Sequence, residues 1–432
     1  MTASVTTKNL LLSVTGMSPA VVTETLYGIA KRIERGDKNA HWPDEIRIVT
    51  TSKGKGEIVS RLVSGDWLRQ VCEAVGQPVI TMDDAHILVV PGADGAAVED
   101  ARSEDDHEAL ANFITKTVRD FTSDDSLRIH ASIAGGRKTM TFYLGYAMSL
   151  FGRHFDRMSH VLISDGFEFA RGFYFPGQLP HRLETGRTVL DTRDARVTLA
   201  DIPFIRMRHN LPTVLTDKAS AGSGLNYRKL VDLINLGDQP ERIRLKVYPR
   251  SRVVSICDTD TDTDTDTEVV SVTLSSPVFA AFYAVFAEEA GDKDGEVFTS
   301  KPFKASEHRL LGYFATKLAC IVHMDTRGMV SAEILEAIQD LDHVTDEFPN
   351  LGRSIKSIAS KGIKGRKLSE LVSAITEQMK KEVPANLLRY VLPVPEFNKD
   401  KKWTGDLDEK GGAKYYGIHL LPEQVFVEQY ED

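Results

Sequence analysis

The sequence has few cysteines, no long apolar run and no excess of positive charge. Its 3 cysteines, Cys72, Cys257 and Cys320, are far apart; this spacing supports neither a disulfide framework nor a cysteine-based zinc site. We expect free thiols, as in a reducing cytoplasm. No segment approaches the ~18 consecutive apolar residues of a membrane span, and the N-terminus lacks the pattern of a secretory signal. These features predict a cytoplasmic protein with no membrane-spanning helix.

The charge balance is negative, with 53 Lys and Arg against 62 Asp and Glu and a formal net charge of −9. Such a chain repels polyanions as a whole, so a nucleotide or nucleic-acid site must be a local positive patch. The length of 432 residues predicts two domains, or three.

In the first half, short apolar runs alternate with segments of helical periodicity. We expect strands at residues 10–15, 46–50, 86–90, 127–132 and 161–164. The helices between them are expected at 19–33, 58–71, 107–121 and 138–151, the first with Ser18 as N-cap and Pro19 as its first residue. This alternation predicts an α/β fold with a Rossmann-like parallel sheet. Ligands of such folds bind beyond the carboxyl ends of the strands.

The pattern changes near residue 195. We expect a first domain over residues 1–200, a connector over 201–240 and a second domain over 241–432. In the second domain the pattern predicts strands at 242–248, 252–256, 269–274, 389–392 and 415–420, and helices at 276–289, 307–322, 331–342 and 367–381. Strands, then helices, then a terminal hairpin predict an α+β domain that resembles a winged helix-turn-helix.

Five consecutive Asp-Thr pairs occupy residues 258–267. We interpret this acidic, low-complexity tract as a solvated hairpin loop; a metal-binding strip is the alternative. A calcium loop needs a glycine at its turn and a bidentate glutamate at its far end, and the tract has neither.

The loop from Ser132 to Thr139, with the sequence Ser-Ile-Ala-Gly-Gly-Arg-Lys-Thr, joins a predicted strand to a predicted helix. Its two glycines allow close approach of the backbone to a ligand, and the N–H groups at the start of a helix attract anions. Arg137 and Lys138 add positive charge, so the loop predicts phosphate recognition. The alternative is a tight turn with two surface cations. The spacing matches neither a P-loop nor a dinucleotide-binding fingerprint.

A second loop, from Ser13 to Pro19, follows the first predicted strand and provides the hydroxyl groups of Ser13, Thr15 and Ser18. Ser18 has two interpretations, a ligand contact or a simple helix cap. Two helix N-termini at one sheet edge would suit a ligand with several phosphates.

Together these motifs carry a family resemblance. Three segments resemble the CARF-domain ring nucleases of type III CRISPR systems: residues 11–26, 130–140 and 142–146. The first of them reads Leu-Leu-Ser-Val-Thr-Gly-Met-Ser-Pro-Ala-Val-Val-Thr-Glu-Thr-Leu. The resemblance covers roughly residues 8–215. It implies a homodimer that binds cyclic tetra-adenylate and cuts it, without a metal or other cofactor, into linear di-adenylate with a 2′,3′-cyclic phosphate.

The resemblance also implies site residues. Lys138 would stabilise the transition state and Ser18 would orient the ribose 2′-OH or a phosphate oxygen. The expected ligand-binding residues are Ser13, Thr15, Gly16, Met17, Ser132, Ala134, Gly135, Gly136, Arg137 and Thr139. Many relatives have threonine at the position of Met17, so one possible hydrogen bond is absent here.

Histidines offer no convincing metal or ribonuclease site. We interpret His130 as a structural histidine in a strand. Arg153 and His160 match the loose spacing of HEPN ribonucleases, but they fall between a helix and a strand, so we interpret this spacing as coincidence.

Residues 353–402 hold 12 Lys and Arg against 5 Asp and Glu. They include Lys361, Lys364, Arg366 and Lys367, and Lys399, Lys401 and Lys402 beside Trp403. This segment is either a solvated basic face or a recognition helix and wing for DNA or another nucleic acid. The sequence thus leaves two functions open, a ring nuclease or a sensor of cyclic oligoadenylate whose second domain regulates transcription.

Overall fold

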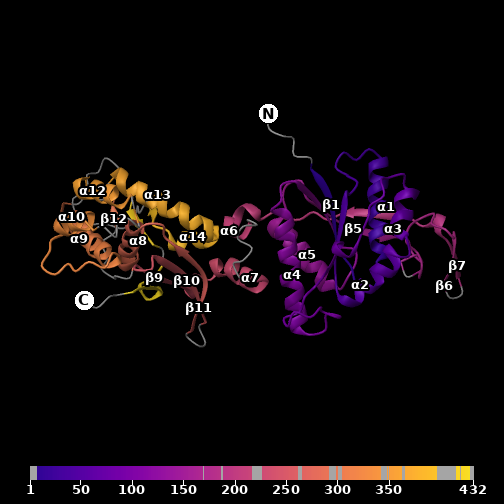
Figure 1. Ribbon diagram of the computed structural model, residues 1–432, viewed down its shortest axis with the longest axis horizontal. Helices are drawn as coiled ribbons and strands as arrows, with labels where there is room; N and C mark the ends of the chain where they lie inside the picture. The colour runs from indigo at the N-terminus through magenta and orange to yellow at the C-terminus, as the bar shows by residue number, and fades with distance from the viewer. Residues whose placement is uncertain are drawn as a thin grey trace. The chain divides into compact units, whose positions relative to one another are not determined.

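The computed structural model describes residues 7–168, 170–185, 188–216, 226–260, 265–290, 298–299, 304–341, 348, 350–361, 365–396, 415–418 and 420–428 (Figure 1). The chain forms two compact units. The first comprises Met1–Leu211 and Leu215–Arg228, and the second comprises Pro212–Val214 and Lys229–Asp432.

The first unit is built on a six-stranded sheet with the order β3-β2-β1-β4-β5-β8. Its strands are β1 (Lys8–Val14), β2 (Glu45–Thr50), β3 (Ile87–Val89), β4 (Leu127–Ser132), β5 (Arg157–Ile163) and β8 (Val197–Asp201). All neighbours are parallel except β5 and β8, which pair antiparallel. A separate hairpin consists of β6 (Arg182–Thr185) and β7 (Thr188–Asp191).

Helices cover both faces of this sheet, with α1 and α3 on one side and α4 and α5 on the other (Figure 1). Their bounds are Ala20–Glu34 for α1, Ser52–Ile58 for α2, Trp67–Ala74 for α3, Glu104–Thr122 for α4 and Lys138–Phe151 for α5. The predicted Rossmann-like fold is therefore confirmed.

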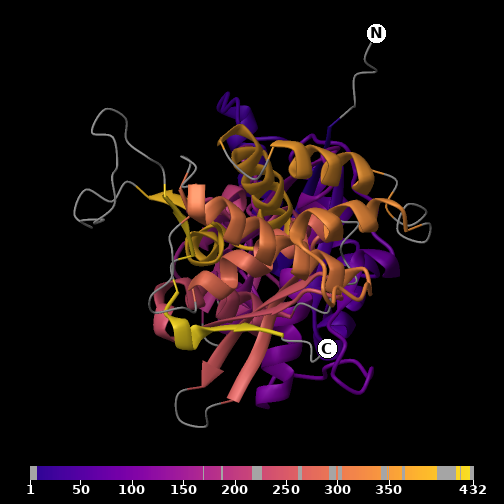
Figure 2. The same ribbon diagram turned by 90° about the vertical axis from the view of Figure 1, so that its left-hand side faces the viewer.

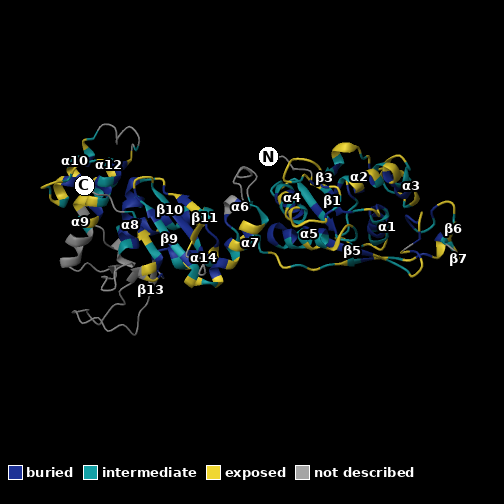
Figure 3. Ribbon diagram, turned by 90° about the horizontal axis from the view of Figure 1, so that it is seen from below, coloured by how far each residue is buried: buried dark blue, intermediate teal, exposed yellow. Residues whose placement is uncertain are grey.

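The central strands lie where their sequences require. Strand β1 is buried from Leu10 to Val14 without alternation, as expected for a parallel strand covered on both faces. In Figure 3 the exposed residues lie mainly on the outer helical faces, the loops and the β6–β7 hairpin. Burial on both faces thus explains why continuous apolar runs in the sequence predicted the central strands.

The start of α1 differs from the expectation. The helix begins at Ala20, and Pro19 occupies the N-cap position with helical backbone angles (φ −71°, ψ −11°). Ser18 is not the N-cap, and no side chain caps this helix. The prediction of a Ser18 cap is wrong because the helical conformation of Pro19 moves the cap one residue along the chain.

The second unit is α+β. Its main sheet has the order β11-β10-β9-β15, formed by β9 (Ile243–Tyr248), β10 (Val253–Asp260), β11 (Thr265–Thr273) and β15 (Val425–Val427). A smaller sheet has the order β12-β14-β13, formed by β12 (Phe298–Thr299), β14 (Tyr415–Gly417) and β13 (Val394–Glu396).

Helix α8 packs on β9 and β15 of the main sheet, and α13 packs on β11. In the view of Figure 2 most helices of the unit lie above the β10–β11 hairpin. The helices are α6 (Thr213–Thr216), α7 (Tyr227–Asn235), α8 (Pro277–Ala290), α9 (Lys304–Ile321), α10 (Ser331–Gln339), α12 (Leu351–Lys361), α13 (Gly365–Glu382) and α14 (Ala385–Val391). Helix α6 begins within the short stretch assigned to this unit, and α7 starts in the first unit and continues into this one.

Two expectations for this unit are wrong. Residues 389–391 of the strand predicted at 389–392 are the end of helix α14, because Val391 lies one helical turn after both Leu387 and Leu388 and the three side chains are buried together. The Asp-Thr tract is not all loop, since Asp258–Asp260 and Thr265–Thr267 are paired in the β10–β11 hairpin. Asp266 also forms an ion pair with Lys246 at 2.8 Å.

No helix in the described part of the chain is long and apolar enough to cross a membrane.

Candidate functional site

The crevice of the first sheet lies between β1 and β4. These neighbours are parallel, and their following helices pack on opposite faces, α1 on one side and α5 on the other. Open α/β sheets bind ligands at such a reversal of strand order, beyond the carboxyl ends of the strands. The two loops singled out in the sequence, at residues 15–18 and 132–138, both start there.

Glycines bring these loops into contact. A Cβ atom at Gly135 would lie 2.8 Å from Val21 Cγ2 and 2.9 Å from Val14 O, so only glycine fits. Gly136 has φ +82° and a Cβ at Gly16 would lie 3.7 Å from Gly136 Cα. The backbone of the β4–α5 loop therefore turns directly against the end of β1.

A cavity of about 860 Å³ opens at this crevice. Such a volume is typical of small-molecule sites, which span ~300–1,000 Å³. The lining residues come from five segments: those that follow β1, β2, β3 and β4, and the end of β5 with the residues after it. The β2–α2 loop was not selected from the sequence. The lining includes Gly16, Met17, Ser18, Glu24, Thr51, Lys53, Asp100, Ala134, Gly135, Gly136, Arg137, His160 and Glu168.

The expected site residues fall into two layers. The lining layer holds Gly16, Met17, Ser18, Ala134, Gly135, Gly136 and Arg137. Ser13, Thr15 and Ser132 are fully buried outside the lining, and Thr139 lies in the first turn of α5 with a buried hydroxyl oxygen. The second group therefore supports the loops and does not face the cavity.

The buried hydroxyl groups fasten the loops to the sheet. Thr15 Oγ1 donates a hydrogen bond to the Ser18 carbonyl oxygen at 2.9 Å, which closes the β1–α1 turn. Ser132 Oγ and Thr25 Oγ1 are 3.1 Å apart and share a hydrogen bond. Ser13 pairs in register with Ser132. With Thr15 holding its carbonyl group, Ser18 presents an exposed side chain at the cavity.

Arg137 is held by an acidic partner. Its Nε donates a hydrogen bond to Asp100 Oδ1 at 2.8 Å, and its NH2 group pairs with the same oxygen. Arg137 and then Arg102 hold the pKa of Asp100 below its ordinary value. A phosphate that binds Arg137 must therefore compete with the Asp100 carboxylate.

Lys138 is the first residue of α5, and its side chain is exposed. It lies outside the cavity lining, immediately after Arg137 at the rim. Within the residues that the structure describes, no carboxylate forms an ion pair with it. Its ammonium group is available to an anion, and the helix N-terminus adds positive potential at the same place.

Glu24 was missed in the sequence analysis. It lies on α1, lines the cavity, and is only 8% exposed. Burial, and then the Glu168 carboxylate, raise the pKa of Glu24 to about 8. The carboxyl group is therefore mostly protonated at neutral pH, so it adds little negative charge to the cavity. The sequence signal was an acidic residue three positions after Val21 on the apolar side of a helix.

The β2–α2 loop was missed as well. Thr51 accepts a hydrogen bond from Gly54 N, and a Cβ at Gly54 would lie 3.0 Å from Gly16 O. Lys53 lines the cavity and pairs with Glu99 at 2.9 Å. The signal was the Thr-Ser-Lys-Gly sequence directly after a strand, which repeats the pattern of the other two loops.

His130 and Arg153 have structural roles, whereas His160 lies at the candidate site. His130 Nε2 and Ser159 Oγ are 2.7 Å apart, and burial lowers the pKa of His130 to about 4. Arg153 is buried and pairs with Asp156 at 2.9 Å, at the start of β5. His160 instead lines the cavity. The described residues contain no group of three or more His, Cys, Asp or Glu arranged to hold a metal.

Fold and site together define a Rossmann-like protein with a ligand crevice at the β1–β4 reversal of its sheet. Residues 18–232 match the model of a family described as CRISPR-associated protein NE0113. The matched segment includes Ser18, Glu24 and the whole β4–α5 loop. The chain is similar to this family over most of its first unit, and the similarity supports a role in CRISPR systems. No curated protein matches the chain.

Proposed function

We propose that the first unit binds cyclic tetra-adenylate and cleaves it as a metal-independent ring nuclease. The observation that carries this proposal is the meeting of the β1–α1 and β4–α5 loops around one cavity, with Lys138 at the start of α5. This arrangement provides backbone N–H groups and a helix N-terminus at the cavity, and the ammonium group of Lys138 beside it, for a phosphodiester of the ligand. The similarity to a CRISPR-associated family is consistent with such a signalling nucleotide.

A homodimer is part of the proposal. A four-membered ring has two-fold symmetry, and a two-fold interface presents each loop twice. Each cavity would then hold half of the ring. Exposed apolar side chains around the cavity are consistent with a surface that a second subunit covers. Met17 and Leu162 line the cavity and are 59% and 50% exposed, and Phe142, one turn after Lys138, is 60% exposed.

In the proposed reaction the ribose 2′-OH attacks the adjacent phosphorus in line, and the bond to the 5′ oxygen breaks. The products are a 2′,3′-cyclic phosphate and a 5′-OH, so no water is consumed in this step. Lys138 would stabilise the charge that develops on the phosphoryl oxygens. Ser18, whose hydroxyl lies at the cavity, would orient the 2′-OH or a phosphate oxygen.

Glu24 would assist binding in its protonated form. A neutral carboxyl group can donate a hydrogen bond to the ligand and does not repel its phosphates. With a pKa of about 8 for this group, affinity for the anionic ligand should fall as the pH rises above 8.

The test is incubation of the full chain with cyclic tetra-adenylate in EDTA, followed by chromatography of the products. We expect linear di-adenylate with a 2′,3′-cyclic phosphate. Lys138→Ala should slow single-turnover cleavage ~30–1000-fold, the cost of one transition-state donor worth ~2–4 kcal/mol. Lys116→Ala is the matched control, because Lys116 is an exposed α4 lysine paired with Asp120. A wild-type rate in Lys138→Ala would show that the assigned role is wrong.

A sensor is the second candidate function. It is favoured by the second compact unit, about as large as the first, which ring cleavage alone does not require. Tight binding of cyclic tetra-adenylate without product after long single-turnover incubation would favour it over the nuclease. The basic segment then becomes the candidate DNA surface. Lys399, Lys401, Lys402 and Trp403 lie outside the described residues, so the predicted wing stays a prediction. A gel shift with promoter DNA at two salt concentrations tests this surface.

A further inference from the structure

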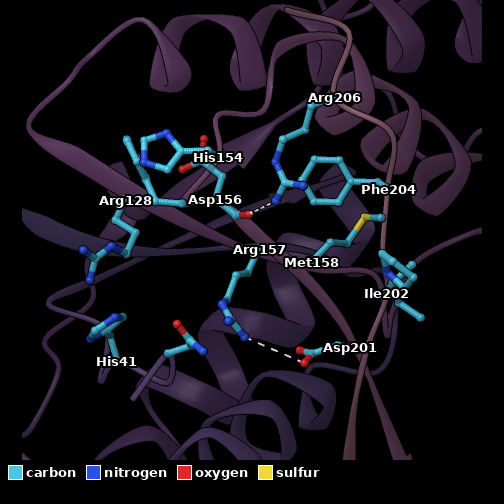
Figure 4. Close-up of a pocket in the computed structure, with 13 residues that line it drawn as sticks. His41, Arg128, His154, Asp156, Arg157, Met158, Asp201, Ile202, Phe204 and Arg206 are labelled. Carbon is cyan, nitrogen blue, oxygen red and sulfur yellow. Dashed lines mark hydrogen bonds and ion pairs between the residues drawn. The ribbon is translucent and has the colours of Figure 1, made fainter. Parts of the chain in front are cut away.

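A second cavity, of about 360 Å³, lies at the other end of the strands of the first sheet, away from the crevice (Figure 4). The parallel strands β4 and β5 contribute residues near their starts, Arg128 and Arg157, and the antiparallel β8 contributes its last residue, Asp201. The crevice described above lies instead beyond the carboxyl ends of the parallel strands. Its other walls are the α1–β2 loop, the α5–β5 loop and the segment after β8. None of these residues takes part in the proposed nuclease.

The cavity concentrates positive charge in a chain whose net charge is −9. Arg128, Arg157 and Arg206 line it together with His41 and His154. Figure 4 shows Arg128 directed toward His41. Burial, and then the guanidinium groups of Arg128 and Arg157, hold the pKa of His41 below its ordinary value.

The two lining aspartates neutralise this charge only in part, because each is engaged more closely with an arginine outside the lining. Asp156 is fully buried and accepts hydrogen bonds from Arg153 Nε at 2.9 Å and Ile129 N at 2.9 Å. Asp201 pairs with Arg32 at 2.7 Å, and Arg157 reaches it only at 3.7 Å. The excess positive charge of the lining arginines is therefore left for a ligand.

Two of the arginines differ in how they are held. Arg206 donates hydrogen bonds to the carbonyl oxygens of Arg153 and Asp156, at 2.9 and 3.0 Å, so its position is fixed without loss of charge. Arg128 has no carboxylate within ion-pair distance among the described residues. A guanidinium group in this state is suited to bind phosphate oxygens with two parallel hydrogen bonds.

Hydrogen bonds and ring packing hold the walls of the cavity in place. Ile202 N donates to Met158 O at 2.9 Å, which extends the antiparallel pairing of β8 with β5. The Phe204 ring covers Gly152, where a Cβ would lie only 2.8 Å from the ring. Arg206 stacks on the same ring at 4.4 Å. The segment after β8 is thus fastened to the sheet, and the cavity keeps its shape without a ligand.

We propose that this cavity is a binding site for the phosphate group of a small phosphorylated ligand, held chiefly by Arg128 with Arg157 and His41. The site is separate from the nucleotide crevice and does not depend on the proposed nuclease activity. Its small volume excludes a nucleic-acid strand, and its charge excludes a neutral metabolite. The free phosphate ion and a nucleoside monophosphate share the required chemistry, and the experiment distinguishes them.

The test is calorimetric titration of the full chain, at low ionic strength, with inorganic phosphate, pyrophosphate and AMP in turn. We expect one binding event per chain that depends on Arg128 and is weakened at least ~10-fold in Arg128→Gln. Arg128→Lys keeps the charge but not the two parallel hydrogen bonds, so its affinity should fall between those of Arg128→Gln and the wild type. Arg35→Gln is the matched control, since Arg35 is an exposed arginine at the end of α1 that does not line the cavity. It should bind as the wild type does.

The Arg128→Gln variant separates this site from the nucleotide crevice, because Arg128 lines only the second cavity and a binding event in the crevice should not depend on it. Tighter binding of AMP than of phosphate identifies a nucleotide ligand, and equal binding identifies the phosphate group alone as the ligand feature that is recognised. The proposal is overturned if Arg128→Gln, folded as judged by circular dichroism, binds all three probes like the wild type. It is also overturned if Arg35→Gln loses as much affinity as Arg128→Gln.

Discussion

Replacement of Glu24 by glutamine should make the first unit less sensitive to alkaline pH. The carboxyl group is buried on α1 at the candidate site, and its pKa rises from 4.5 to about 8 on folding. A carboxyl group with a raised pKa binds a proton more tightly in the folded state. The contribution of Glu24 to the stability of the folded state is therefore fully present below pH 4.5 and is lost as the pH rises through about 8. Glutamine has nearly the same shape and does not ionise, so this loss should disappear.

The size of the effect follows from the two pKa values, 4.5 and about 8. Each pH unit between them removes about 1.4 kcal/mol from the free energy of unfolding. The wild type should thus lose ~3 kcal/mol by pH 7 and a little under ~5 kcal/mol above pH 8.5, relative to Glu24→Gln. These are large fractions of the ~5–15 kcal/mol stability of a typical domain.

The assay is urea unfolding of the full-length wild type and variant at pH 5, 7 and 9, followed by tryptophan fluorescence. Trp42 and Trp67 belong to the first unit, and Trp67 stacks on Tyr174 with ring centroids 4.3 Å apart. The transition of this unit can therefore be followed in the intact chain. The expected result is a difference in the free energy of unfolding that grows from pH 5 to pH 9 in favour of Glu24→Gln.

Glu34→Gln is the matched control on the same helix. Glu34 is exposed, and its hydrogen bond to Lys31 lowers its pKa, so this carboxyl group is ionised in both states over the pH range used. Its difference from the wild type should stay constant between pH 5 and 9. A constant difference for Glu24→Gln as well, or one that shrinks with rising pH, would refute the reasoning about burial.

Three further outcomes follow from contacts in the first unit. Asp100→Asn should tighten binding of cyclic tetra-adenylate several-fold, because it removes the carboxylate that holds the loop arginine, whereas the exposed Asp105→Asn should not; weaker binding by Asp100→Asn would contradict the proposed competition. Gly135→Ala should lower the free energy of unfolding by ~1–3 kcal/mol, since its Cβ would lie 2.8 Å from a valine methyl group. Gly56→Ala, with nothing within 4 Å in helix α2, should be neutral or stabilising by up to ~1 kcal/mol in the same denaturation assay. Asp156→Asn should cost ~3–5 kcal/mol, because it removes the buried carboxylate closest to the Arg153 guanidinium group and leaves only the exposed Asp125 at 3.8 Å; a loss below ~1 kcal/mol would show that the Arg153–Asp156 ion pair is dispensable.

Local patterns were most reliable where one face of a segment or both faces of a strand are buried. The uninterrupted apolar run of β1 and the periodicity of α1, α4 and α5 predicted these elements because packing on the sheet reinforces their local preference. The segment at 389–392 shows the opposite case. Its tyrosine and valine favour a strand, but Leu387, Leu388 and Val391 bury a helical face, and packing prevailed.

The candidate site was predictable to the extent that it is made of loops that follow strands. The Gly-Met-Ser-Pro and Gly-Gly-Arg-Lys motifs each indicate a loop that joins a strand to a helix. Because the carboxyl ends of parallel strands lie on the same side of the sheet, the two loops were expected to lie close together. Lys53 was missed although it follows the same pattern. Glu24 was missed because a charged residue on a helix is normally solvated, and only the packing of α1 against the sheet decides that this one is buried.

The sequence by itself determined the Rossmann-like first unit and the two glycine loops that meet at its crevice, because both depend on burial patterns and turn residues within short segments. It also excluded a P-loop, which depends on local spacing alone. The tertiary structure alone decided that Asp100 holds Arg137, that Glu24 is protonated near neutral pH, and that Arg128 and Arg157 form a second cavity with the segment after β8. Each of these features joins residues far apart in the chain, and the free energy that brings them together comes from packing of the whole unit.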